Sequence, residues 1–159
     1  MTFHHIIRKK YVTCDCGFTL VELLIVIAII GTLAAIAMPL FSQYINMVKI
    51  SKAKSEIGML SREITSYYLE HNHYPNNLAE IGFGAMIDPW RNPYKYLPVA
   101  GTPMGMLRKD HSMVPINQDY DLYSMGKDGK SQPPFTAQAS LDDIVRANDG
   151  SYIGLVSQY

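Results

Sequence analysis

An uninterrupted apolar segment near the N-terminus most constrains how this chain can fold. Residues 18–38 read FTLVELLIVIAIIGTLAAIAM, and Glu22 is the only charged residue among them. As an α-helix this segment would be about 31 Å long, close to the hydrocarbon thickness of a bilayer. The basic residues Arg8, Lys9 and Lys10 precede it. This order favours a cytoplasmic N-terminus and a C-terminal region on the other side of the membrane.

Three interpretations of this segment compete. A secretory signal peptide has a shorter apolar stretch, followed by small residues such as those at 34–37. A simple membrane anchor fits the length but leaves Glu22 unexplained, because a carboxylate inside a bilayer costs roughly 2.5–3.5 kcal/mol on insertion scales. An acidic residue in this environment calls for a cationic partner.

The third interpretation supplies that partner. The sequence GFTLVE at residues 17–22 resembles the processing site of type IV prepilins and of type II secretion pseudopilins. The resemblance implies that a prepilin peptidase cleaves between Gly17 and Phe18, which removes residues 1–17 as a leader, and that the new N-terminus of Phe18 is methylated. It also implies that Glu22 pairs with the terminal amine of a neighbouring subunit, since two buried charges are tolerated best as a pair.

Helical periodicity continues beyond the apolar segment. We therefore predict one long helix over residues 18–70, with a transmembrane and assembly half at 18–39 and an amphipathic half at 40–71. Pro39 interrupts its middle and predicts a kink, and the resemblance adds that this stretch can melt in assembled filaments. The apolar stripe of the second half recurs at spacings of three and four: Ala53, Ile57, Leu60, Ile64 and Tyr67.

Residues 72–159 predict a small head, so the expected fold class is α+β, a long N-terminal helix packed against a small antiparallel sheet. Alternating patterns predict strands at Tyr94–Leu97 and Tyr120–Ser124, and a last apolar strand within Tyr152–Tyr159. The only tryptophan, Trp90, is expected to pack the head against the helix. Residues 100–117 are rich in Gly, Pro and Met and predict an exposed loop.

Two head segments resemble the major pseudopilin of type II secretion. The first is DPWRNPY at residues 88–94, where Arg91 stands in place of the usual glycine and suggests an ordinary backbone conformation. Asp88 in this segment is expected to have a turn or capping role rather than a catalytic one. The second is SMGKDG at residues 124–129, followed later by LDDI at residues 141–144.

In the major pseudopilin, the segments that resemble residues 124–129 and 141–144 form a calcium loop. The resemblance therefore implies a Ca²⁺ site here. Calcium takes six to eight oxygen ligands from carboxylates and carbonyls. Asp128, Asp142 and Asp143 would supply side-chain oxygens, and Met125 and Lys130 would supply backbone carbonyls. The alternative is a Lys-Asp-Gly turn together with an ordinary helix cap at Asp142.

The expected function is a structural subunit of a helical filament, a homo-oligomer anchored in the inner membrane with its head in the periplasm. The resemblance favours a type II secretion pseudopilus, assembled with minor pseudopilins on an inner-membrane platform. The alternative is a type IV pilus subunit, although the only two cysteines, Cys14 and Cys16, lie in the leader and leave no disulfide loop.

A balance of 14 basic and 14 acidic residues gives no indication of direct nucleic-acid binding. No hydrolase, zinc-protease or phosphate-loop motif indicates an enzyme.

Overall fold

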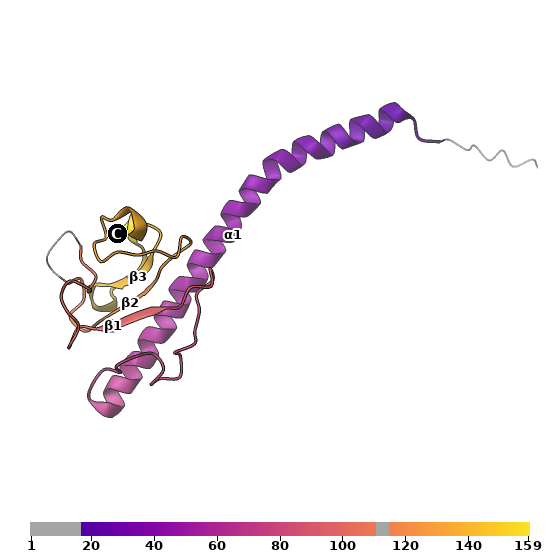
Figure 1. The fold of residues 1–159 in the computed structure, drawn as a ribbon. Helices are drawn as coiled ribbons and strands as arrows, with labels where there is room; N and C mark the ends of the chain where they lie inside the picture. Colours follow the sequence, from indigo (N-terminus) through magenta and orange to yellow (C-terminus); the bar gives the residue numbers. More distant parts are fainter. Residues whose placement is uncertain (1–16, 111–114) are drawn as a thin grey trace, which may run out of the picture. The chain divides into compact units, whose positions relative to one another are not determined.

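The computed structural model describes residues 17–110 and 115–159, and it confirms the α+β class (Figure 1). The chain divides into an N-terminal unit that ends at Ser42 and a head that begins at Gln43. The helix α1 belongs to both units. The described elements are α1 (Leu20–His71), β1 (Lys95–Pro98), β2 (Tyr120–Ser124), η1 (Gln138–Ser140), β3 (Ile144–Ala147), η2 (Asn148–Gly150), β4 (Tyr152–Leu155) and η3 (Val156–Gln158).

The N-terminal unit consists of the first part of α1 and the short segment before it. Its large apolar side chains are exposed, from Phe18 to Phe41. By length and composition, α1 is a helix that can cross a membrane, with a mean hydropathy of 2.7 in its most apolar window. Pro39 lies inside α1 without ending it. The predicted melting of this stretch in filaments stays a prediction.

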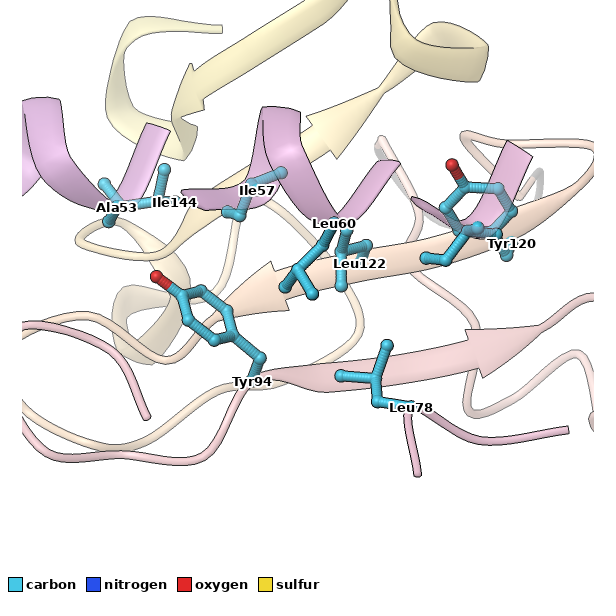
Figure 2. Close-up of a cluster of buried hydrophobic side chains, with 9 residues drawn as sticks. Ala53, Ile57, Leu60, Leu78, Tyr94, Tyr120, Leu122 and Ile144 are labelled. Carbon is cyan, nitrogen blue, oxygen red and sulfur yellow. The ribbon is translucent and has the colours of Figure 1, made fainter. Parts of the chain in front are cut away.

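The head is built on the second part of α1, whose apolar stripe is buried as predicted. Ala53, Ile57, Leu60 and Ile64 recur every three or four residues and are completely buried. Figure 2 shows these helix residues facing side chains from the sheet and from the segments that lead into it. The residues of the head that complete this core are Leu78, Tyr94, Tyr120, Leu122 and Ile144. Trp90 packs against the edge of the same core, which confirms its predicted position.

Four antiparallel strands form the sheet, in the order β1-β2-β3-β4. Both faces of β3 are covered, because all four of its residues are buried. Ile144 belongs to the core against α1. Val145 and Ala147 belong to a second apolar cluster, with Phe135 and Val156 from the segments that flank β3 and β4. β3 is therefore covered by the core against α1 on one face and by Phe135 and Val156 on the other.

The strand predictions are confirmed in part. β2 has the predicted bounds, and β1 is shifted by one residue from the prediction. The last strand ends at Leu155 and continues as the short helix η3. The sequence did not predict β3.

Two local predictions are wrong. Arg91 has a φ of 77°, a left-handed conformation that suits glycine and strains other residues. Residues 100–117 are not simply an exposed loop, because Leu107, Arg108 and Asn117 are buried. Hydrogen bonds explain the second result, since the backbone N–H of Arg108 donates to Asp121 and the Asn117 amide donates to Asp121 and to the carbonyl of Arg146.

Candidate processing and assembly site

The predicted processing site lies just before the first turn of α1. Gly17, Phe18 and Thr19 are outside regular secondary structure, and the Phe18 side chain is 84% exposed. Apart from its neighbours in the chain, no described residue has an atom within 4 Å of the position that a Cβ on Gly17 would occupy. Among the described residues, the bond between Gly17 and Phe18 therefore lies in an exposed, non-helical segment. The rest of the leader, residues 1–16, is outside the described residues.

Glu22 and Thr19 form a capping box at the start of α1. The backbone N–H of Thr19 donates to Glu22 Oε2 at 2.8 Å, and the Thr19 hydroxyl donates to the same oxygen at 2.7 Å. In return, the backbone N–H of Glu22 donates to Thr19 Oγ1 at 3.2 Å. This reciprocal arrangement satisfies donors that the first turn of a helix leaves unpaired. Within one chain, the Glu22 carboxylate therefore has local partners.

The capping role of Glu22 was not predicted from the sequence. The signal was present, because Thr-Leu-Val-Glu at residues 19–22 matches the S/T-x-x-E pattern of a capping box. The pattern predicts a helix start at Leu20, where α1 begins. The capping box and the predicted pairing with a neighbouring amine use the same carboxylate. Pairing between subunits is not tested by a single chain and stays a prediction.

The DPWRNPY segment forms a tight turn organised by Asp88, which confirms its predicted turn role. Asp88 Oδ1 accepts hydrogen bonds from the backbone N–H groups of Trp90 and Asn92, at 2.9 and 2.8 Å. Asp88 Oδ2 accepts a bond from the Ser124 hydroxyl, and the Asn92 amide donates to the carbonyl of Gly126 at 2.8 Å. The two pseudopilin-like segments of the head are thus bonded to each other.

The two halves of the predicted calcium loop also lie together, through hydrogen bonds to Asp142. Its Oδ2 atom accepts bonds from the backbone N–H groups of Lys127 and Asp128, at 2.7 and 3.0 Å. Gly126 has a φ of 62° and passes so close to the Asp142 carbonyl that a Cβ would lie 2.3 Å from it. Asp128 Oδ1 accepts a bond from the N–H of Lys130 at 2.7 Å. Both carboxylates therefore bond to backbone donors of the turn.

Asp143 points in another direction, into the head. It is completely buried, and its Oδ2 atom accepts bonds from Arg108 Nη2 at 2.7 Å and from the Ser131 hydroxyl at 2.6 Å. Burial raises the pKa of Asp143 to about 6, and the bonds from Ser131 and Arg108 offset part of that rise. Among the described residues, no three acidic, histidine or cysteine side chains gather as a metal site requires. Calcium binding by Asp128, Asp142, Asp143 and the carbonyls of Met125 and Lys130 stays a prediction.

A membrane-type apolar helix with an open processing segment, followed by an α+β head, defines the class of pilin-like filament subunits. Comparison with known proteins gives the same class. The prokaryotic N-terminal methylation motif matches residues 13–38. The chain is thus similar to members of the type IV pilin-like superfamily.

Two kinds of relative match the chain over different lengths. The type II secretion system core protein G of Pseudomonas aeruginosa is 29% identical over 137 residues, which cover 72% of this chain and 84% of that protein. The fimbrial protein of Neisseria meningitidis is 40% identical over 76 residues, or 48% of this chain and 45% of its own length. A type IV major pilin protein, PilE1 of Neisseria gonorrhoeae, is 41% identical over 70 residues, 42% of its length. The chain thus spans less than half of these pilins. No solved structure matches it significantly.

These relatives are structural pilin and pseudopilin subunits, not enzymes. The methylation motif spans the predicted cleavage site between Gly17 and Phe18, and processing by a prepilin peptidase and assembly into filaments stay predictions. The apolar helix and the pilin-type relatives fit a membrane-anchored subunit.

Proposed function

We propose that this chain is the major pseudopilin of a type II secretion system, a repeating subunit of a short filament that helps export folded proteins across the outer membrane. The observation that carries the proposal is the extent of the match to core protein G, which covers 84% of that protein and reaches well into the head. The pilin matches have higher identity but cover less than half of each pilin. The longer match to core protein G supports the pseudopilin over the pilin.

In this proposal the unassembled subunit resides in the inner membrane, with the first part of α1 across the bilayer and the head in the periplasm. After cleavage, the methylated amine of Phe18 on an incoming subunit pairs with Glu22 of its neighbour. A subunit with a one-sided apolar stalk and a small head adds head-to-tail, and such contacts do not close, so they generate a filament. The proposed partners are further copies of the chain, the prepilin peptidase, minor pseudopilins and an inner-membrane assembly platform.

The alternative is a type IV pilus subunit for adhesion, motility or DNA uptake, and the 40% identity to the fimbrial protein favours it. A deletion of the gene in its own host separates the two. For a pseudopilin we expect folded secreted proteins to accumulate in the periplasm while surface fibres remain. Complementation with the full chain should restore secretion. Loss of surface fibres with normal secretion would overturn the proposal in favour of a pilus subunit.

A further inference from the structure

Arg108 is a buried arginine whose position the sequence did not predict. It lies in the segment at residues 100–117, yet its side chain is only 2% exposed. The segment is fixed on both sides of the residue, since the N–H of Arg108 donates to Asp121 Oδ2 at 2.6 Å and its carbonyl accepts a bond from the N–H of Ile116 at 3.0 Å. The guanidinium is therefore held in place by the backbone and directed into the head.

The guanidinium binds oxygens from both ends of the segment at residues 131–143. Its Nη1 atom donates to the Ser131 hydroxyl and to the Gln132 carbonyl, the latter at 2.6 Å. Its Nη2 atom donates to Asp143 Oδ2 at 2.7 Å. The Ser131 hydroxyl also donates to this oxygen, so the three acceptors are joined in one network. Two of these acceptors, the carboxylate and the carbonyl, are the kinds of oxygen that calcium binds in protein loops.

Aromatic rings enclose the same guanidinium. Its central carbon lies 4.6 Å from the centre of the Tyr123 ring and 5.1 Å from that of Phe135. These rings keep water away and favour a cation by their electron-rich faces. A second cation brought to Asp143 would be repelled by the guanidinium at short range, because water is absent to screen the two charges. One of the carboxylates expected to bind calcium, that of Asp143, is already paired with Arg108 through its Oδ2 atom.

We propose that Arg108 is a built-in cation that closes the segment at residues 131–143 by binding Asp143, one of the predicted calcium ligands. The head then folds and stays folded without the metal ion. The segment at residues 100–117 thus supplies the charge. This inference does not depend on whether the filament is a pseudopilus or a surface pilus.

The first test measures the melting temperature of the full chain in detergent, with the fluorescence of Trp90 as the signal. We compare about 1 mM calcium, a concentration at which extracellular calcium modules are occupied, with a calcium chelator. The expected result is the same melting temperature in both conditions. A rise of several degrees with calcium, reversed by the chelator, would overturn the proposal, because ligand binding stabilises the folded state.

The second test removes the cation. Arg108→Gln should lower the melting temperature by about 10 °C or more, because an unpaired buried carboxylate is strongly destabilising in a head of this size. Arg62→Gln removes an exposed arginine from α1 and is the matched control, with no shift expected. The double variant Arg108→Gln/Asp143→Asn should melt well above Arg108→Gln, since no charge is left unpaired.

These variants overturn the proposal if Arg108→Gln melts like Arg62→Gln. If Arg108→Gln does not fold, the double variant decides. A folded double variant supports the charge pair as the cause, and an unfolded one shows that Arg108 acts through packing alone and overturns the assigned role.

Discussion

Glu22 and Thr19 are bonded to each other three times across the first turn of α1, through two bonds accepted by Glu22 Oε2 and one donated by the Glu22 N–H. Glu22 thus has a local task, capping the helix, in addition to the proposed pairing with a neighbouring subunit. The two tasks need different chemistry. Capping requires a side-chain acceptor, which glutamine also supplies, whereas pairing with an amine requires a negative charge.

Glu22→Gln separates these tasks. It keeps the capping box but removes the charge, so we expect filament assembly to fall by about two orders of magnitude, as for a buried charge left without its partner. The measurement is the fraction of the chain that sediments as filaments from membranes. Thr19→Ala is the control, since it weakens the cap and keeps the charge, and it should assemble nearly normally. Normal assembly of Glu22→Gln would show that the charge is not needed.

Arg91→Gly should stabilise the head. The left-handed backbone at Arg91 strains a residue with a Cβ, and relief of that strain, less the entropy that glycine loses on folding, should give roughly 0.5–1 kcal/mol. Denaturant unfolding of the full chain in detergent measures this difference. Arg91→Ala is the matched control, because it removes the side chain and keeps the strain. Equal stabilisation by both variants would assign the effect to the side chain instead of the backbone.

Leu122→Ala tests the core between α1 and the sheet. Leu122 is completely buried among the side chains drawn in Figure 2. Its truncation should lower the free energy of unfolding by about 2–5 kcal/mol, the usual cost of a leucine cavity. Leu69→Ala, at a position of α1 that is 78% exposed, should change it by less than about 0.5 kcal/mol. Similar losses in both variants would contradict the described packing.

Asp121 should make the stability of the head depend on pH. Burial raises the pKa of Asp121, and the hydrogen bonds from Arg108 and Asn117 offset part of that rise. The folded state therefore holds the proton more tightly than the unfolded chain, whose carboxyl titrates near pH 4. The stabilisation is complete below that pH and is lost as the pH rises through the higher pKa of the folded state.

The measurement is the free energy of unfolding of the full chain from pH 4 to pH 7. We expect Asp121→Asn to show a smaller decline with rising pH than the wild type. Glu63→Gln, at an exposed position on α1, should leave the decline unchanged. If the wild type and Asp121→Asn have parallel profiles, Asp121 does not titrate differently in the folded state.

Local patterns made the helix and two strands predictable from the sequence. The burial of Ala53, Ile57, Leu60 and Ile64 follows from their spacing alone, because one helix face meets one core. β3 was missed for a physical reason. It is covered on both faces and contains Arg146, which is buried because its guanidinium bonds to Asp119 at 2.6 and 2.8 Å. An arginine paired across 27 residues gives no alternating pattern.

The site was predictable to a similar extent. Gly17, Phe18 and Glu22 lie close together in the sequence, so their pattern predicted the processing site. The capping box of Thr19 and Glu22 is equally local, but it was overlooked. The network of Arg108 was not visible, because its partner Asp143 lies 35 residues away. Only the fold brings Arg108, from the segment at residues 100–117, to Asp143, a predicted calcium ligand.

The order of the strands in the sheet is also their order along the chain, β1-β2-β3-β4. Each strand joins the edge left by the strand before it, and none has to enter between two that are already paired. A head that enters its compartment in chain order, with the first part of α1 held in a membrane, can thus complete its sheet in the sequence in which it is delivered. Pairing between consecutive strands keeps the sequence separation of contacting residues small. A small separation favours fast folding.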